Sequence, residues 1–238
     1  MSFVKIENLF FSYSNTNLVF ENLSLNLNKG EIGVLLGASG SGKSTLLRSI
    51  AGFEKPKSGK IYVAEQLVFN NETSIPTRNR NIGFIFQNLA LFPHLNVEQN
   101  ILFGITDLPK AEQAKRLTEL LSLTNLQGYN LKKPENLSGG EKQRVALARS
   151  LAPKPDLLLM DEAFSSLDPD LRLSMRQEVK SILKSQGITA LVVTHDHQEA
   201  YELADQLGVL EKGSLKVWGP RNNFFKTVQR EVQILSVV

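Results

Sequence analysis

The 238-residue sequence contains no cysteine, one tryptophan and three histidines. Without cysteine the chain forms no disulfide and holds no metal through thiolates, which is typical of proteins in a reducing compartment. No apolar run reaches the about 18 residues that a membrane-spanning helix needs. The first residues, 1–7, also lack the charged and apolar regions of a signal peptide. We therefore expect a chain that neither spans a membrane nor is exported.

The sequence also lacks a strong excess of charge. It has 27 Lys and Arg against 24 Asp and Glu, and no basic cluster is interleaved with aromatic residues. A nucleic-acid partner is therefore not indicated. Hydrophobic residues make up 42% of the chain, which is enough for the core of one large or two small domains.

Residues 37–45 form a glycine-rich segment between a predicted strand (32–36) and a helix-forming run (46–51). They are Gly37, Ala38, Ser39, Gly40, Ser41, Gly42, Lys43, Ser44 and Thr45. The glycines let backbone N–H groups point at phosphate oxygens, and the start of the helix adds the positive end of its dipole. Lys43 is expected to reach the β- and γ-phosphates and the Ser44 hydroxyl to bind Mg²⁺. A flexible turn is the alternative, but the strand–loop–helix order favours a nucleotide site.

A second pair of glycines begins another predicted helix. Ser138 can cap this helix, and Glu141 stands three residues later, as in a capping box. An ordinary capped helix is the simplest interpretation, yet two glycines in the first turn cost roughly 1 kcal/mol each. Gly139 and Gly140 are better explained if their backbone N–H groups, with no side chains in the way, approach an anion. The segment therefore predicts a second phosphate-binding surface.

Two carboxylates follow a run of large apolar residues at 157–160, which predicts a buried parallel strand. Asp161 and Glu162 stand at its carboxyl end, where open α/β sheets bind ligands. Asp161 would hold Mg²⁺, and Glu162 would orient or deprotonate an attacking water. Alone, the pair could merely end a strand; together with the phosphate loop, it favours catalysis.

These segments together resemble the ATPase subunits of ABC transporters over nearly the whole chain. Residues 137–141, LSGGE, are similar to the family's signature motif, 157–162 to its Walker B strand, and 165–168, SSLD, to its D-loop. The resemblance implies ATP and Mg²⁺ as ligands. It also implies that two copies enclose two ATP molecules head to tail, so that the signature acts on the nucleotide of the opposite copy, and it assigns Asp168 of the D-loop to nucleotide binding.

The resemblance assigns three further residues. Gln87 would contact Mg²⁺ and the attacking water, His195 would sense the γ-phosphate, and Tyr13 would stack on adenine. Each also has a structural interpretation. Gln87 and His195 follow apolar strands and could be ordinary strand ends, while Tyr13, close to Phe10 and Phe11, could belong to the core.

The element pattern, with the resemblance, predicts an α/β fold with a P-loop NTPase core, in which helices flank a mostly parallel sheet. The predicted fold includes an N-terminal antiparallel β portion, and an α-helical sub-domain is inserted into the core. We expect one domain, 1–238, with a nucleotide-binding core (1–87 and 153–238) and a helical sub-domain (88–152) that carries the signature. The predicted early strands are 3–13, 23–27, 31–36, 59–63, 66–69 and 82–86; the predicted inserted helices are 97–104, 110–123 and 139–151; strands and helices alternate over 157–210.

Residues 78–87 and 90–95 resemble the importers of ferric ion, sulfate, polyamines and sugars, among which we favour ferric ion. The resemblance implies a homodimer, a polytopic permease docked near Leu89–Leu95, an extracytoplasmic solute-binding protein, and a peripheral position at the cytoplasmic face of the inner membrane. Leu91, Phe92 and Leu95 are expected to form an exposed apolar docking patch, with packing onto the helices as the alternative. Many of these importers carry a carboxyl-terminal regulatory domain, which we do not expect after Trp218.

Three residues depart from the usual pattern of the family: Glu141, Ala163 and His197. None of them removes a reacting group.

One alternative function is that of a soluble ATPase of the same class that acts in translation or DNA repair, but those proteins usually have two cassettes or a long insertion. The other is a module that binds ATP without hydrolysing it, and the presence of Glu162 argues against that function.

Overall fold

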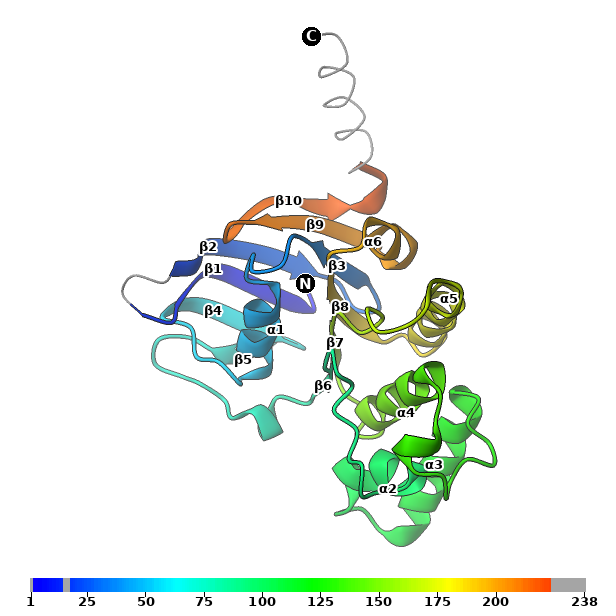
Figure 1. Cartoon of the computed structure of the whole chain (residues 1–238). Coiled ribbons are helices and arrows are strands. Elements are labelled where there is room, and N and C mark those ends of the chain that lie inside the picture. Colours follow the sequence, from blue (N-terminus) through cyan, green and yellow to red (C-terminus); the bar gives the residue numbers. More distant parts are fainter. Residues whose placement is uncertain (1, 15–17, 224–238) are drawn as a thin grey trace.

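The computed structural model describes residues 2–14 and 18–223, and within them two β-sheets with helices packed around them (Figure 1). The first sheet is antiparallel, with the strand order β2-β1-β4-β5. Its strands are β1 (Val4–Ser12), β2 (Leu18–Leu27), β4 (Ser58–Val63) and β5 (Gln66–Phe69). The expected antiparallel portion near the amino terminus is therefore present.

The second sheet has six strands in the order β10-β9-β3-β8-β7-β6. Its neighbouring strands run parallel except at β10, which pairs antiparallel with β9. They are β3 (Ile32–Leu36), β6 (Ile82–Ile85), β7 (Leu157–Asp161), β8 (Thr189–Thr194), β9 (Gln206–Glu211) and β10 (Ser214–Pro220). The parallel order brings the carboxyl ends of β3, β6, β7 and β8 to one edge, where ligands bind in such sheets.

The helices fall into two groups. Between β6 and β7 the chain forms α2 (Val97–Leu102), α3 (Lys110–Leu123) and α4 (Gly139–Leu151), which gather to one side in Figure 1. The others are α1 (Lys43–Ala51), α5 (Pro169–Ser185) and α6 (His197–Leu203), and short 3₁₀ turns are η1 (Thr77–Asn79), η2 (Phe103–Ile105) and η3 (Pro134–Asn136). None of the helices in the described ranges is long and apolar enough to cross a membrane. The predicted fold class is confirmed.

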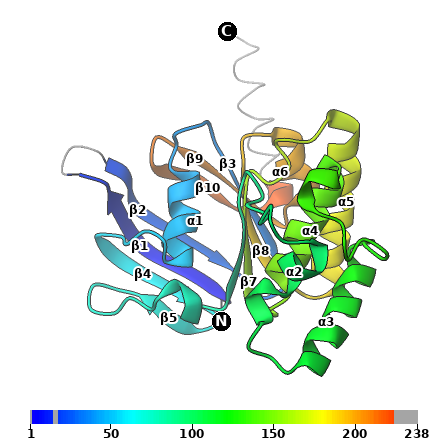
Figure 2. The ribbon, with the colours of Figure 1, turned by 60° about the horizontal axis from the view of Figure 1, so that its bottom comes forward.

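The central strands separate two hydrophobic layers because successive side chains of a strand point to opposite faces. In β7, Leu157 and Leu159 pack with α1 and the antiparallel sheet, whereas Leu158 and Met160 pack with α4 and α5 on the other face. Figure 2 shows α1 on the side of the antiparallel sheet and α4 and α5 on the opposite side. A strand buried on both faces has the continuous apolar pattern seen in the sequence.

Two boundaries differ from the predicted ones by more than one residue. Strand β2 begins at Leu18 rather than 23, because a register shift interrupts its alternation: Glu21 and Asn22 both face solvent, and Asn22 has a φ of 51°. Such a bulge adds a residue to one strand, so the period-2 pattern is lost. The predicted helix 97–104 ends at Leu102 and continues as the 3₁₀ turn η2. Strand β10 was not predicted.

Arg80 joins the phosphate-loop helix to strand β6. Its guanidinium is buried and donates hydrogen bonds to the carbonyls of Ser49 (3.0 Å) and Ile50 (2.7 Å), at the carboxyl end of α1. Burial lowers the pKa of Arg80. Gly52 leaves the space for it, since a Cβ there would lie 2.7 Å from the Arg80 Nε. The end of α1 is thereby held against the residues that precede β6.

Candidate functional site

The loop from Gly37 to Gly42 links β3 to α1, and with the first residues of that helix it presents backbone donors. Gly42 is the N-cap residue, with a φ of 103° and no side chain to accept from the first-turn N–H groups. Gly40 also has a positive φ, of 78°, which glycine adopts without strain. The Ser41 hydroxyl oxygen is buried and has no hydrogen-bond partner among the described residues. The loop therefore offers unused polar groups where an anion would bind.

Lys43 places its ammonium group inside the curve of this loop. Its Nζ donates to the carbonyl oxygens of Gly37 (2.7 Å) and Ala38 (2.9 Å) and lies 3.9 Å from Glu162 Oε1. Burial lowers the pKa of Lys43, while the charges of Glu162 and Asp161 act in the opposite direction. The structure thus holds a cation at the centre of the loop.

A cleft of about 430 Å³ opens over the loop. Its lining residues are Tyr13, Val19, Ser39, Gly40, Gly42, Lys43, Ser44, Thr45, Gln87 and Glu162. Tyr13 is 52% exposed, its hydroxyl lies 3.3 Å from the Thr45 Oγ1, and its ring packs edge-on against Phe11 at 4.9 Å. Phe11 is buried in the core, so of these two rings Tyr13 is the one available to a ligand.

The residues predicted to hold a metal lie side by side. The Ser44 hydroxyl donates to Asp161 Oδ1 at 2.7 Å, and both residues line a second cleft of about 690 Å³ together with Gln87. Burial raises the pKa of Asp161, an effect that the Ser44 hydrogen bond opposes. The described residues contain no group of three or more His, Cys, Asp and Glu side chains that could hold a metal. One carboxylate with a hydroxyl and an amide fits Mg²⁺, which usually takes one or two carboxylates together with phosphate oxygens.

Three side chains converge on Glu162: Gln87 and His195 follow strands β6 and β8, and Lys43 begins helix α1. His195 Nδ1 lies 3.1 Å from Glu162 Oε2, the Gln87 amide donates to the same oxygen at 3.5 Å, and Lys43 approaches the other oxygen. Glu162 has a φ of 46°, a left-handed conformation that costs energy in a residue other than glycine. Its own N–H donates to the Val193 carbonyl of β8 at 3.0 Å, which holds this turn in place.

Two arginines of α5 position the turn that carries His195, and the sequence did not single them out. Arg176 Nη2 lies 2.5 Å and Arg172 Nη1 3.6 Å from Oδ2 of Asp196, the residue after His195. Arg172 also donates to the Leu167 carbonyl at 2.8 Å. The segment after Glu162 is therefore linked to the His195 turn. The sequence does show two arginines one helical turn apart, but it does not show that their partner, Asp196, will come from another element.

The glycine pair lies outside the cleft of its own chain. Ser138 Oγ accepts from the N–H of Glu141 (3.3 Å), and the Glu141 carboxylate accepts from that of Ser138 (2.6 Å), so the predicted capping box is present. The Ser138 N–H and the Tyr129 hydroxyl hold the pKa of Glu141 below its usual value. Gly139 is exposed, whereas Gly140 is buried. None of these four motif residues is among those that line the cleft.

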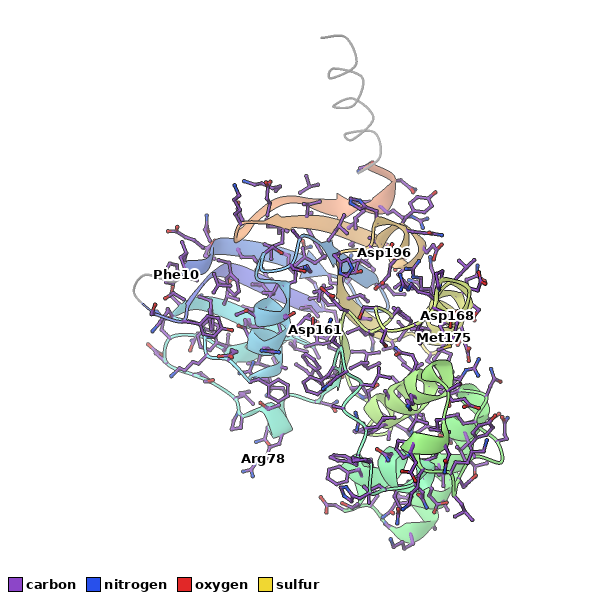
Figure 3. All side chains as sticks on the ribbon, in the orientation of Figure 1. Phe10, Arg78, Asp161, Asp168, Met175 and Asp196 are labelled. Carbon is purple, nitrogen blue, oxygen red and sulfur yellow. The ribbon has the colours of Figure 1, made fainter. Side chains whose placement is uncertain are left out.

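Asp168 is also absent from the cleft lining. It is the N-cap residue of α5, and its side chain accepts from the Leu171 N–H at 3.0 Å. Figure 3 labels Asp168 beside α5 and Asp161 near the middle of the molecule, next to α1. Within one chain, Asp168 therefore caps a helix.

The expected exposed patch at 89–95 is wrong in part, because the segment packs on the helices. Leu89 is buried, while Leu91, Phe92 and Leu95 are half-buried. The ring centroids of Phe92 and Phe103 are 4.3 Å apart. The buried Asn100 side chain bonds the N–H and carbonyl of Phe92 and the Leu95 carbonyl, and so supplies partners that a helix or strand would otherwise provide. The exposed aromatic here is Phe103, at 53%.

Known proteins share both the sequence and the fold. Residues 20–165 match the family described as ABC transporter. The chain is 43% identical over 225 residues to the Fe(3+) ions import ATP-binding protein FbpC of Haemophilus influenzae, covering 93% of this chain and 63% of that protein. It is 48% identical over 212 residues to the putrescine transport ATP-binding protein PotG of Escherichia coli, covering 88% and 55%. The sulfate/thiosulfate import ATP-binding protein CysA of Synechocystis is 43% identical, with 87% and 58% covered.

Two solved structures have the same fold. The cbiO1 protein from Clostridium perfringens, part of the ABC transporter complex cbiONQ, superposes with a TM-score of 0.85 at 30% identity, covering 98% of this chain and 95% of that one. The dimeric ATP-binding cassette MJ0796, in a post-hydrolysis state bound to ADP and Pi, gives 0.78 at 32% identity, covering 92% and 98%. The chain spans 55–63% of the length of the three curated relatives described above. By its family match and these relatives, the chain belongs to the ABC transporter family.

Proposed function

We propose that this chain is the ATP-binding and ATP-hydrolysing subunit of an ABC importer, driven by ATP-dependent pairing of two copies. The observation that carries the proposal is the convergence of Lys43, Gln87 and His195 on Glu162 beside a phosphate loop. A dimeric relative of the same fold is described with ADP and Pi bound. The importer names of the curated relatives support coupling to uptake.

The cleft lining assigns the binding roles. Tyr13 would stack on adenine at the exposed end, the amides at the start of α1 would bind phosphate oxygens, and Lys43 would leave its two carbonyl acceptors to reach the terminal phosphates. Ser44, Asp161 and Gln87 would hold Mg²⁺. When bound, this ion neutralises phosphate charge and polarises the transferred group.

Glu162 is the proposed general base. Its carboxylate would accept a proton from the attacking water, and the Gln87 amide, which contacts that carboxylate, would help to orient the water. His195 meets the same carboxylate oxygen through Nδ1, which fixes its ring at the carboxyl end of β8. From there it would donate a hydrogen bond to the terminal phosphate and sense the loss of that group on hydrolysis.

The position of the signature residues favours a site completed by a second copy. Ser138, Gly139 and Gly140 begin the 13-residue helix α4 and leave the cleft of their own chain untouched. Exposed N–H groups at such a helix start bind anions well. We propose that two copies associate head to tail, so that this helix start and Asp168 of one copy face the nucleotide of the other.

We further propose that residues 88–152 act as a helical sub-domain between the two parts of the core, 1–87 and 153–238. Its surface near residues 89–95 would receive a cytoplasmic segment of the membrane permease, which places the chain at the cytoplasmic face of the membrane. An extracytoplasmic solute-binding protein would complete the system. Relatives named for ferric ion, putrescine and sulfate have similar identities, so the similarity selects no solute, and ferric ion stays a prediction.

The docking proposal predicts that Phe103→Ser weakens co-purification with the permease by about tenfold, as expected when a large exposed aromatic is lost from the centre of an interface. Phe103 is half exposed and stacks on Phe92, so basal hydrolysis by the isolated chain should stay unchanged. Leu131→Ser is the control, because Leu131 is an 82% exposed apolar residue elsewhere in the helical block, between α3 and α4. Equal loss of binding in both variants, or in neither, contradicts docking at Phe103.

Hydrolysis itself is tested by phosphate release from the purified chain. We expect Mg²⁺-dependent turnover of ATP, and a loss of about a hundredfold or more in Lys43→Ala, because phosphoryl transfer depends on the charge that this lysine supplies. Uptake by cells that express the chain with its permease separates the importer from a soluble ATPase of the same class. An active chain that binds no permease and supports no uptake would favour the soluble ATPase.

A further inference from the structure

Gln87 lies in a tight turn at the end of β6. Gln87 and Asn88 are its two central residues, and the N–H of Leu89 donates to the Phe86 carbonyl at 2.8 Å to close it. Leu89 and Ala90, which follow, have φ angles of 59° and 46°. Two successive residues other than glycine in the left-handed region are strained, and they persist only where the surroundings hold them.

Arg149 of α4 holds this pair. Its Nη2 donates to the Leu89 carbonyl and its Nη1 to the Ala90 carbonyl, each at 2.7 Å. The guanidinium also lies over the Phe92 ring, 5.3 Å from its centroid. The planar fork of arginine thus serves two neighbouring carbonyls and stacks on an aromatic ring at once, which the single ammonium of lysine cannot reproduce.

We propose that Arg149 is a positioning residue that fastens the Gln87 turn to α4. Helix α4 begins at the Ser138 cap, so a displacement of that helix start reaches Leu89 through the Arg149 fork. From Leu89 the closed turn carries the displacement to Gln87, whose amide contacts Glu162. The consequence for catalysis rests on the proposed function, in which a second copy engages the start of α4 and Glu162 activates water.

The tether joins two segments that are far apart in the sequence but in direct contact in the fold. Arg149 stands near the carboxyl end of α4, and 59 and 60 residues separate it from the two carbonyls that it binds. Leu89 itself is buried in the hydrophobic cluster that includes residues of α4. Side-chain packing and two charge-assisted hydrogen bonds therefore act on the same turn. Helix α4 and the Gln87 turn therefore move together as long as the packing and the two hydrogen bonds are intact.

Arg149→Lys tests the tether, with Arg116→Lys as a matched control. Arg116 also donates to two successive carbonyls, those of Leu151 (2.6 Å) and Ala152 (3.2 Å), but at the end of α4. Loss of one charge-assisted bond should speed amide exchange of Leu89 by about tenfold in Arg149→Lys. The same amide should exchange at the wild-type rate in Arg116→Lys. Unchanged exchange of Leu89 in folded Arg149→Lys protein would overturn the tether.

Kinetics show whether the tether acts through Gln87. In Arg149→Lys we expect kcat for ATP hydrolysis to fall about tenfold with KM within about twofold, because water positioning and not ATP binding is disturbed. In a Gln87→Ala background, the same change should have no further effect. An undiminished effect in that background, or a normal kcat, contradicts the role. A wild-type chain without ATPase activity would refute the proposed function, while the exchange experiment still decides the tether.

Discussion

Glu162→Gln is expected to abolish steady-state phosphate release while MgATP still binds with near wild-type affinity. The amide has almost the shape of the carboxylate and keeps the contacts with Gln87 and His195, but it cannot accept a proton from water. Removal of a general base costs about 10² to 10⁴ in rate. Binding should persist because Lys43 and the loop amides are intact. Phosphate release and ATP titration of the purified variant measure the two effects.

The same variant should form a stable pair with ATP. Two uncleaved nucleotides between two copies cannot reset the pair, so the mass in solution should double with ATP and remain that of one chain with ADP. Glu119→Gln is a suitable control. This carboxylate is exposed, pairs with Arg116 and belongs to α3, none of whose residues line the cleft. Normal turnover by Glu162→Gln would remove Glu162 from the assigned role.

Gly139→Asp is expected to suppress pairing and hydrolysis while a single copy still binds ATP. The new carboxylate would stand beside a phosphate of the opposite copy. At about 4 Å and an effective dielectric constant of about 20, two like unit charges repel by about 4 kcal/mol, on the order of a thousandfold in affinity. ATP binding in one chain should not change, because Gly139 does not line its own cleft. Light scattering and phosphate release report the loss.

Gly139→Asn separates charge from size. Asparagine has nearly the shape of aspartate, and Gly139 is exposed, with one leucine side-chain atom, of Leu167, near the site of a new Cβ, at 3.1 Å. We expect Asn to retain much more activity than Asp. If both substitutions lower activity equally, crowding and not charge is the cause, and an anion at this helix start is not supported.

Local patterns in the sequence predicted the elements that carry the site, and together with the resemblance to the family they predicted the fold class. The apolar runs before Gly37, Asp161 and His195 correspond to β3, β7 and β8, because strands buried on both faces need continuous apolar sequence. Parallel pairing then brings their carboxyl ends together. The clustering of Lys43, Ser44, Asp161, Glu162, Gln87 and His195 at this edge therefore follows from the strand pattern.

The features that were missed depend on contacts between distant segments. The 89–95 segment looked unable to bury its apolar side chains because the sequence does not show that Asn100 will satisfy its backbone. Likewise, nothing near Arg149 in the sequence indicates that it binds the carbonyls of residues 89 and 90, and nothing near Arg172 indicates its ion pair with Asp196. Strand β2 was shortened because its bulge breaks the alternation on which the prediction relied.

The most direct test of a nucleotide site shared by two copies is to mix Lys43→Ala with Gly139→Asp protein and measure phosphate release. A mixed pair contains one intact site, with Lys43 from one copy and Gly139 from the other. Random pairing of equal amounts would put about half of the copies in mixed pairs and give about a quarter of the wild-type rate. Because Gly139→Asp weakens pairing, the account predicts a rate well above that of either variant alone and up to about this value. If both variants are folded and the mixture is no more active than the separate proteins, the signature does not act across two copies, and the account is contradicted.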